Sequence, residues 1–307
     1  MGICDGRVAI VTGAGRGIGR EHALMLAAEG AAVVVNDRGG DTDGSGGDPG
    51  PARQVVAEIE AAGGRAVANG ADVTDFDGAA AMVAQAVDAF GRLDVLVNNA
   101  GILRDRMVFS MDEQDWDDVV AVHLKGHFCP TRHAAAYWRA EAKAGRPVDG
   151  RVITTTSPSG LYGNVGQTNY GAAKAGIAAF TLVCALELGR LGVTANCLAP
   201  TAVTRLVAPV MGGDENIPDE LRERLSPRWV ATVGTWLASP LSRGVTGRVF
   251  DVRGDTIAIA EGWHRGPDAT NPGDPAGAGK VIEDLLARAR PNGDLDGRDD
   301  PDRFPGL

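Results

Sequence analysis

Short runs of apolar residues, most of them β-branched, alternate along the chain with longer alanine-rich stretches in which apolar positions recur every three or four residues. Runs of the first kind predict strands, and stretches of the second kind predict helices. The predicted strands cover residues 8–11, 32–36, 66–68, 95–97, 152–155, 193–197 and 249–252. The predicted helices cover residues 18–28, 52–62, 76–90, 113–139, 168–190 and 228–238. Because strands alternate with helices and are apolar at nearly every position, the pattern predicts an α/β fold, a parallel seven-stranded sheet with helices on both faces.

The alternation stops near residue 253, so we expect one domain over residues 1–253 and a C-terminal extension over residues 254–307. The extension is rich in Pro, Gly and Asp except at residues 280–290, where an apolar stripe predicts a short helix. The stripe consists of Val281, Ile282, Leu285 and Leu286. It predicts that the helix packs on its own domain or, as the alternative, closes the active site of a neighbouring subunit.

Length and composition limit the class of protein. The chain has 307 residues, of which 44% are hydrophobic, enough to bury one large core. The formal net charge is −10, which argues against an extended basic surface for nucleic acid. A single globular domain that acts on a small-molecule substrate is therefore expected.

The cysteines indicate a reducing compartment. Cys4, Cys129, Cys184 and Cys197 are widely spaced and form no Cys-x-x-Cys pair, so neither a zinc site nor disulfides are expected. No charged leader with an apolar signal core precedes the first predicted strand, and no segment is judged long and apolar enough to span a bilayer. We therefore expect a cytoplasmic protein with no membrane span.

A glycine-rich turn follows the first predicted strand. Gly13, Gly17 and Gly19 remove Cβ atoms that would keep pyrophosphate oxygens away from the backbone. The helix that begins at Ile18 then points its amino end at the anion. Such a turn is also common as a purely structural feature, so it needs support from other motifs.

Tyr170 and Lys174 lie four residues apart in a predicted helix, with Ser157 a short distance upstream. Residues with this spacing project from one helix face, so the ammonium of Lys174 can lie near the phenol of Tyr170 and favour its ionised form. An unperturbed tyrosine has a pKa of about 10, so a useful phenolate fraction at neutral pH needs that pKa lowered by roughly 2 to 3, or about 3 to 4 kcal/mol. A tyrosine so placed can move a proton.

Four ordered motifs resemble those of the short-chain dehydrogenase/reductase family: Thr12-Gly13-x-x-x-Gly17-x-Gly19, Asn98-Asn99-Ala100-Gly101, Ser157 and Tyr170-x-x-x-Lys174. The resemblance covers residues 7 to 252 and implies a single doubly wound Rossmann domain. It also implies hydride transfer between a carbinol carbon and a nicotinamide cofactor. In this family Tyr170 would act as general base in oxidation and acid in reduction, Ser157 would hold the substrate oxygen, and Lys174 would bond the nicotinamide ribose.

The same resemblance assigns further residues to the cofactor and the substrate. Asp72 and Val73 are expected beside the adenine. The segment Asn99, Ala100 and Gly101 is expected to line the cofactor. Pro200 and Val203 are expected beside the nicotinamide, and residues 203–225 are expected to form a substrate lid.

Asp37 favours NAD over NADP. It ends the second strand about 20 residues beyond the glycine turn, where a carboxylate accepts hydrogen bonds from the adenosine ribose and repels a 2′-phosphate. Arg16 and Arg38 argue the other way, because either can pair with a phosphate and because NADP-using relatives often carry a basic residue at the place of Arg16. We expect NAD.

Residues 38–51, beside this adenosine site, are rich in Gly and Asp and exceed the usual strand-to-helix loop of about 2 to 6 residues. Their composition is typical of a flexible surface insertion. The alternative is a flap over the cofactor.

The chain departs from the family pattern at His123, because the fourth catalytic member of the family is usually an asparagine at this place. Ser159 competes with Ser157 for the serine role, but Ser157 has the family's spacing to Tyr170 and is favoured. His123 and His127 also stand four apart, as metal ligands can. No metal is expected, since neither a glutamate between them nor a third ligand is evident.

Three stretches, residues 35–41, 63–69 and 161–167, resemble the (3R)-hydroxyacyl-CoA dehydrogenase module of peroxisomal multifunctional enzymes, which shares the histidine at position 123. The resemblance implies an NAD-dependent dehydrogenase of (3R)-3-hydroxyacyl-CoA that forms a homodimer or homotetramer. A steroid or another bulky secondary alcohol is the alternative substrate. Candidates for a CoA phosphate contact are Arg104, Arg106, Arg205 and Arg253.

A rival from another class is a catalytically silent dinucleotide-binding sensor. Such a sensor would be expected to lack at least one residue of the catalytic Ser/Tyr/Lys set. The set of Ser157, Tyr170 and Lys174 is intact, which favours an enzyme.

Overall fold

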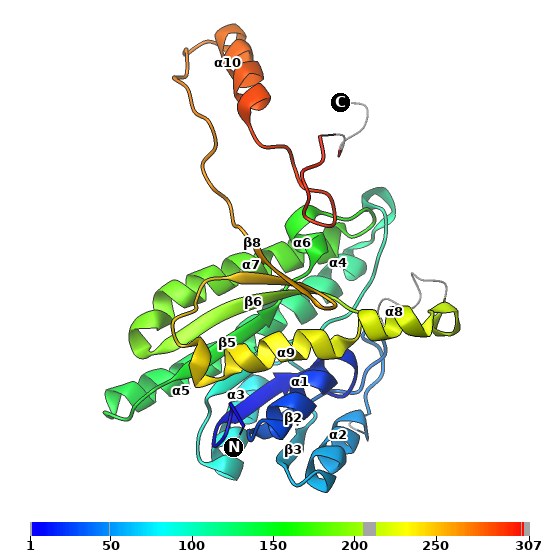
Figure 1. The fold of residues 1–307 in the computed structure, drawn as a ribbon, viewed down its shortest axis with the longest axis vertical. Helices are drawn as coiled ribbons and strands as arrows, with labels where there is room; N and C mark the ends of the chain where they lie inside the picture. Colours follow the sequence, from blue (N-terminus) through cyan, green and yellow to red (C-terminus); the bar gives the residue numbers. More distant parts are fainter. Residues whose placement is uncertain (1, 49, 205–212, 302, 304–307) are drawn as a thin grey trace.

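The computed structural model describes residues 2–48, 50–204, 213–301 and 303. Eight strands form one sheet in the order β3-β2-β1-β4-β5-β6-β7-β8 (Figure 1). The strands are β1 (Val8–Thr12), β2 (Ala32–Asn36), β3 (Arg65–Asn69), β4 (Val95–Asn98), β5 (Gly150–Thr155), β6 (Val193–Thr201), β7 (Val249–Arg253) and β8 (Thr256–Ala260). The first seven pair in parallel, and the predicted α/β sheet is confirmed for all seven.

Strand β8 was not predicted. It pairs antiparallel with β7, and Arg253 lies opposite Thr256 across a tight turn. Gly254 in that turn has φ +55°, and a Cβ there would lie 2.2 Å from the carbonyl oxygen of Arg224. The strand has the apolar sequence Ile-Ala-Ile-Ala after Thr256, but it lies at the edge of the sheet and leaves Ile257 and Ile259 exposed, unlike the buried strands. The sheet therefore continues seven residues beyond position 253.

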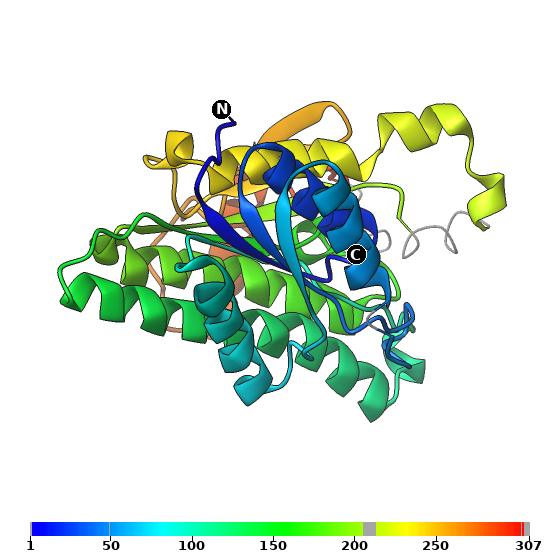
Figure 2. The same cartoon turned by 90° about the horizontal axis from the view of Figure 1, so that it is seen from below.

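Helices cover both faces of the sheet, as the pattern predicts. On one face lie α1 (Gly17–Ala28), α2 (Gly50–Ala61) and α9 (Pro227–Ala238). On the other lie α3 (Phe76–Phe90), α5 (Gly126–Lys143) and α7 (Thr168–Leu188). Figure 2 shows α9 and α1 on one side of the strands and α5 and α7 on the other.

Two apolar cores hold these layers together. Neighbouring strand residues point to opposite faces, so Val11 enters the core with Leu26 and Leu237, whereas Ile10 enters the core with Trp138. All five side chains are at most 2% exposed. This double burial explains why the strands read as unbroken apolar runs.

The helix predicted over residues 113–139 is interrupted. It consists of α4 (Glu113–Val120), a π-helical turn η2 (Ala121–Lys125) and α5. Pro130 is the one sequence sign of irregularity, because it lacks the amide hydrogen that would bond the carbonyl of Gly126. The π turn carries His123.

Several short elements escaped prediction because they lack an apolar repeat of their own. They are α6 (Pro158–Tyr162), α8 (Asp219–Arg224), η1 (Val108–Ser110), η5 (Asp214–Asn216) and η6 (Pro240–Ser242), whereas η3 (Gly189–Leu191) forms the end of the helix predicted over residues 168–190. Of these, α6 matters most for the site, because Ser157 is its N-cap residue.

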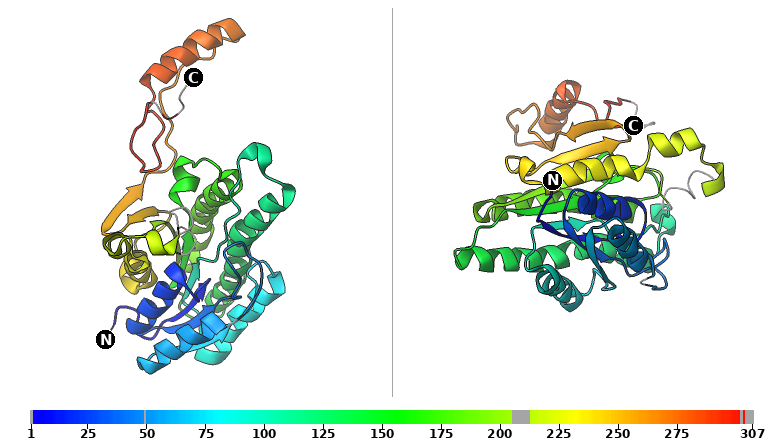
Figure 3. Two further views of the ribbon diagram at one scale, coloured as in Figure 1. Left: turned by 90° about the vertical axis from the view of Figure 1, so that its right-hand side faces the viewer. Right: turned by 60° about the horizontal axis from the view of Figure 1, so that its bottom comes forward.

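The extension forms α10 (Pro275–Arg288), which begins five residues before the predicted helix. Its N-cap residue Asp274 accepts a hydrogen bond of 2.9 Å from the amide of Gly277, which fixes the earlier start. No residue of α10 is buried, and Figures 1 and 3 show it standing clear of the domain. The prediction that this helix packs on its own domain is therefore wrong, and Ile282 and Leu286 of its stripe are exposed.

By length and composition alone, one helix in the described part of the chain is long and apolar enough to cross a membrane, Thr168–Leu191. The prediction that no segment meets this criterion is wrong. The stretch contains α7, which buries Asn169, Lys174 and Leu188 inside the domain.

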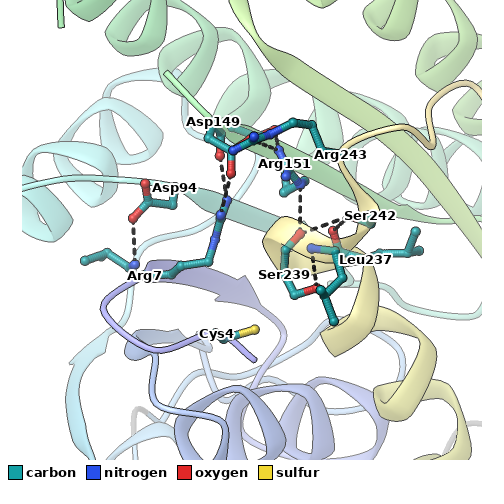
Figure 4. Close-up of polar contacts among 12 residues, drawn as sticks. Cys4, Arg7, Asp94, Asp149, Arg151, Leu237, Ser239, Ser242 and Arg243 are labelled. Carbon is teal, nitrogen blue, oxygen red and sulfur yellow. Dashed lines mark hydrogen bonds and ion pairs between the residues drawn. The ribbon is translucent and has the colours of Figure 1, made fainter. Parts of the chain in front are cut away.

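A cluster of charged residues joins the amino ends of the central strands (Figure 4). Asp149, just before β5, pairs with Arg7 at 2.9 Å, with Arg151 at 2.9 Å and with Arg243 at 3.2 Å. Burial raises the pKa of Asp149, but hydrogen bonds from Arg243, Arg7 and Arg151 outweigh burial and lower that pKa to about 2. The negative charge of Asp149 balances the positive charge of Arg151, whose side chain is only 1% exposed.

Replacing Asp149 by Asn is expected to lower the free energy of unfolding at pH 7 by about 3 kcal/mol, because a buried guanidinium loses its counter-charge. Arg243→Ala is the matched control and should change it by less than about 1 kcal/mol, since Arg243 is 73% exposed. Because the folded-state pKa is depressed, the contribution of Asp149 is present above about pH 4 and is lost as pH falls toward 2. Urea unfolding at pH 7 and pH 3 checks this, and an equal effect of Asp149→Asn at both values would contradict it.

Candidate active site

A cavity of about 470 Å³ lies at the carboxyl ends of the parallel strands. It opens where β1 and β4 are neighbours and the strand order reverses, which is where open α/β sheets bind ligands. Every predicted catalytic residue lines it, namely Ser157, Tyr170, Lys174 and His123. So do most predicted cofactor residues: Gly13, Arg16, Gly17, Ile18, Asp37, Asp72, Val73, Asn99, Ala100, Gly101, Pro200 and Val203.

Gly19 is the predicted cofactor residue that does not line the cavity. A Cβ at Gly19 would lie 2.1 Å from the carbonyl oxygen of Gly13, so this glycine lets α1 pack closely on the turn. Gly13 itself has φ +62°, and a Cβ there would lie 2.8 Å from Cα of Ala100. The turn therefore needs glycine at both positions for different reasons.

The glycine turn is held to the end of β4 by hydrogen bonds. The side-chain amide of Asn99 donates to the carbonyl oxygens of Thr12 (3.0 Å) and Gly13 (3.2 Å). The hydroxyl of Thr12 accepts from the backbone amide of Asn99 at 2.9 Å. Arg16 begins α1 in an extended conformation, no described side chain caps the helix, and its first turn carries no acid. A glycine cradle beside an uncapped helix N-terminus fits a pyrophosphate.

Asp37 lies at the adenosine end of the cavity. Its carboxylate accepts hydrogen bonds from the backbone amides of Gly15 (2.8 Å) and Gly39 (2.6 Å). These bonds fix the carboxylate just beyond the end of β2, where a ribose would present its hydroxyls.

The Gly- and Asp-rich segment folds over this end of the cavity, and Gly40, Asp41 and Gly44 line it. Arg38 donates hydrogen bonds of 2.9 Å to the carbonyl oxygens of Gly44 and Gly46 and pairs with Asp72 at 2.7 Å. The segment also reaches the opposite wall, because the amide of Leu103 donates to the carbonyl oxygen of Thr42 at 3.1 Å. This arrangement favours the flap interpretation of residues 38–48 over a detached surface insertion.

Tyr170 and Lys174 project from α7 toward the end of β5. The ammonium of Lys174 lies 5.4 Å from the centre of the Tyr170 ring and donates to the carbonyl oxygen of Thr155 at 2.7 Å. Its side chain is almost completely buried. Ser157, the N-cap of α6, lies close enough to Tyr170 for its hydroxyl to act on the pKa of the phenol, whereas no such effect comes from Ser159.

Burial opposes the expected effect of Lys174 on Tyr170. Burial raises the pKa of Tyr170 to about 12, although the hydroxyl of Ser157 acts to lower it. Burial also lowers the pKa of Lys174 to about 7, so its ammonium carries only part of a charge at neutral pH. Proximity alone does not ionise the phenol, because removal from water penalises both charged forms.

His123 packs against the phenol edge-on, with ring centres 5.1 Å apart. Its Nε2 lies 2.8 Å from the carbonyl oxygen and 3.2 Å from the amide of Ile102. Gly101 permits this packing, because a Cβ there would lie 2.4 Å from Cε1 of the imidazole. Burial lowers the pKa of His123 well below its usual value. The imidazole is neutral, and its contacts position Tyr170 and the chain after β4.

His127 is a buried packing residue whose Nε2 accepts a hydrogen bond from the amide of Thr155 at 3.3 Å. The described residues contain no group of three His, Cys, Asp or Glu side chains that could hold a metal ion.

Two amide side chains from the stretch of residues 161–167, to which the sequence assigned no individual role, also line the cavity. Gln167 donates to the carboxylate of Asp105 at 2.8 Å and accepts from the side-chain amide of Asn164 at 3.0 Å. Burial raises the pKa of Asp105 despite the bond from Gln167. Leu295 and Asp296 of the extension line the cavity too. No local pattern pointed to Leu295 and Asp296, because long-range chain contacts bring them here.

The predicted lid is described only in part, since residues 205–212, with the candidate Arg205, lie outside the described residues. Its two ends meet, because the amide of Val203 donates to the carbonyl oxygen of Leu225 at 2.8 Å. The other candidates for a CoA phosphate are paired with acids. Arg104 pairs with Asp118, Arg106 with Asp115 and Arg253 with Asp296.

Comparison with known proteins gives consistent matches. Residues 7–210 match the family model described as short chain dehydrogenase. The chain is 47% identical over 266 residues to hydroxyacyl-CoA dehydrogenase ChsB1 of Mycobacterium tuberculosis, covering 85% of this chain and 81% of that protein. It is 45% identical over 261 residues to peroxisomal multifunctional enzyme type 2 of Mus musculus, covering 85% of this chain and 33% of that enzyme.

A solved structure is also similar. The crystal structure of a short chain dehydrogenase from Mycobacterium avium is 54% identical and superposes with a TM-score of 0.84. The match covers 95% of this chain and 98% of that one. It therefore extends over both the sheet domain and most of the C-terminal extension.

The buried ammonium at the centre of the site predicts a pH-dependent stability. Between pH 7 and 9 the unfolded chain keeps Lys174 protonated while the folded protein holds it largely neutral, so the unfolded state binds more protons and stability rises with pH. Without added cofactor, the free energy of unfolding of the wild type relative to Lys174→Met should rise by about 2 kcal/mol from pH 7 to pH 9. Urea unfolding of both proteins measures this, and a difference that stays constant with pH would contradict it.

Proposed function

This chain belongs to the short-chain dehydrogenase family, and on that premise we propose that it oxidises (3R)-3-hydroxyacyl-CoA to 3-oxoacyl-CoA with NAD. The observation that carries the proposal is the convergence of Ser157, Tyr170 and Lys174 on one cavity that also holds the glycine turn. A relative named hydroxyacyl-CoA dehydrogenase supports the substrate class. The (3R) configuration follows the resemblance of residues 35–41, 63–69 and 161–167 to the peroxisomal module.

In the proposed oxidation, the hydroxyl of Ser157 holds the substrate oxygen and Tyr170 removes its proton. As the proton leaves, the C3–H bond breaks with both electrons and a C3=O double bond forms. A nicotinamide bound in this cavity would supply the hydride acceptor and, in its oxidised form, a positive charge. Lys174 is held by Thr155, so its ammonium stays close to the phenol and keeps further N–H groups for a ribose hydroxyl. His123 fixes the ring of Tyr170 from the side.

Two features support NAD rather than NADP. The carboxylate of Asp37 is held at the ribose position by Gly15 and Gly39 and would repel a 2′-phosphate. The two arginines that argued for NADP both form hydrogen bonds to the flap. Arg38 donates to the carbonyl oxygens of Gly44 and Gly46. Arg16 donates to the carbonyl oxygen of Gly40 at 3.4 Å. These bonds to the flap give both arginines a role other than pairing with a 2′-phosphate.

We also propose a homodimer or homotetramer in the cytoplasm. Exposed apolar side chains on α7, Leu182, Val183 and Leu186, support association between copies. The four cysteines are free and buried, which suits a reducing compartment.

The substrate proposal is tested by following reduction of NAD and NADP with (3R)- and (3S)-3-hydroxyacyl-CoA of several chain lengths, steroid alcohols and small secondary alcohols. We expect turnover of (3R)-3-hydroxyacyl-CoA with NAD. In Tyr170→Phe the rate should fall by a factor of about 10² to 10⁴, because the proton acceptor is lost, while NADH binding measured by fluorescence persists. Absence of acyl-CoA turnover would contradict the substrate, and unchanged oxidation by Tyr170→Phe would contradict the mechanism. NADH binding with no turnover of any alcohol would favour the silent sensor.

Cofactor choice is tested by Asp37→Ala. Removing the carboxylate abolishes both its ribose bonds and its repulsion of a 2′-phosphate, so the preference in kcat/KM for NAD over NADP should fall at least about tenfold. Asp43→Ala, in the same acidic segment but outside the cavity, is the matched control and should leave the preference unchanged. A wild type that prefers NADP would overturn the assignment to NAD.

A further inference from the structure

After α10 the chain turns back to the domain and forms a short hairpin, residues 292–300, which we call the C-terminal hairpin. Gly293 and Asp299 pair in an antiparallel bridge. The carboxylate of Asp294 accepts hydrogen bonds from the backbone amides of Asp296 (2.8 Å) and Arg298 (2.9 Å) and thereby holds the turn. Figure 1 shows this red segment beside α6.

Contacts from several directions attach the C-terminal hairpin to its own domain. Arg253, at the end of β7, forms an ion pair with Asp296 and a 3.4 Å hydrogen bond to the carbonyl oxygen of Leu295. Arg303, just after the hairpin, donates to the carbonyl oxygens of Tyr162 (2.9 Å) and Gly163 (2.6 Å) at the end of α6.

The tip of the hairpin also rests on the ring of Tyr162. Gly297 has φ +75°, and a Cβ there would lie 2.8 Å from the hydroxyl oxygen of Tyr162. A larger residue would therefore be strained and would also push the hairpin away from α6.

These contacts place the hairpin on the substrate side of the cavity. Leu295 and Asp296 line the same cavity as Ser157, and Ser157 begins the helix on which the hairpin rests. The glycine turn and Asp37 follow β1 and β2, which lie in the opposite half of the sheet from β7, the strand whose Arg253 holds the hairpin. The ion pair with Asp296 also commits Arg253 to the hairpin, which assigns it a role other than binding a CoA phosphate.

We propose that the C-terminal hairpin is a wall of the substrate pocket, supplied by the same chain, and that Leu295 limits the length of the acyl group accepted. The proposal rests on the proposed function for the identity of the substrate. Leu295 is the apolar side chain that the hairpin contributes to the cavity, whereas Asp296 is neutralised by Arg253. An apolar wall of fixed position suits an alkyl chain, since one methylene more or less changes kcat/KM by a factor of about 10 to 200.

The size-limiting role is tested by measuring kcat/KM with NAD over a series of (3R)-3-hydroxyacyl-CoA chain lengths. Leu295→Trp should lower kcat/KM at least tenfold for the longest chains that the wild type accepts and leave the shortest within twofold. Leu295→Ala should extend the accepted range. Leu286→Trp is the matched control, because Leu286 lies on α10, is 69% exposed and is outside the cavity. An equal effect of Leu295→Trp on all chain lengths, or no effect, would overturn the proposal.

A second measurement does not depend on any substrate. Gly297→Val should detach the hairpin, so hydrogen–deuterium exchange should rise both in residues 292–300 and in residues 158–163 of α6 and its end. Unchanged exchange over 158–163 would refute the wall whatever the enzyme oxidises. If the wild type turns over no acyl-CoA, the proposed function fails while this exchange result still decides the placement of the hairpin.

Co-expression distinguishes a wall from the same chain from one supplied by a neighbouring subunit. Tyr170→Phe removes the chemistry of one chain, and Leu295→Trp blocks long substrates in the other. If each hairpin serves its own chain, mixed oligomers show no long-chain turnover. Restored long-chain turnover would show that the hairpin acts on its neighbour and would overturn the proposal.

Discussion

The site depends on one constraint, the close approach of two backbone segments where β1 and β4 diverge. At this point the chain leaves the sheet toward opposite faces, and a crevice opens at the carboxyl edge. Two features fix the shape of the crevice. The backbone of Gly13 lies so close to that of Ala100 that a Cβ at Gly13 would not fit. The side-chain amide of Asn99 also donates hydrogen bonds to the carbonyl oxygens of Thr12 and Gly13. Helix α1 can then start directly on the turn, since Gly19 also lacks a Cβ. The positions of the glycine turn and of the catalytic residues both depend on this junction.

Burial decides the electrostatics on the catalytic side. Lys174, Tyr170 and His123 all lie where water is largely excluded, and burial moves the pKa of each toward its neutral form. Burial therefore opposes the ionisation of the phenol that the neighbouring ammonium favours. An additional positive charge, such as the proposed oxidised nicotinamide, would favour the phenolate when substrate and cofactor are together. In this account Tyr170 stays protonated until substrate and cofactor are both bound. Proton removal therefore requires the presence of the hydride acceptor.

Sequence predicted the parts of the molecule that depend on local pattern. Seven strands were visible because burial on both faces makes them continuously apolar, and Tyr170 and Lys174 because four-residue spacing fixes one helix face. The π turn around His123 was not visible, since its residues fit an ordinary helical repeat. Strand β8 is a short exposed edge strand that follows β7 after a tight turn, and no helical stretch separates the two as it separates the predicted strands. Leu295 reaches the cavity more than a hundred residues after Ser157, through contacts such as Arg253 with Asp296 that no local pattern records.

Direct observation of the transferred hydrogen tests the central claim, that Tyr170 in this cavity drives hydride transfer from C3 of a hydroxyacyl-CoA. The protein would be incubated with NAD and (3R)-3-hydroxyacyl-CoA that carries deuterium at C3, and the reduced cofactor analysed by mass spectrometry. The account predicts singly deuterated NADH from the wild type and essentially none from Tyr170→Phe. Unlabelled NADH from the wild type, or equal deuterium transfer by Tyr170→Phe, would contradict it.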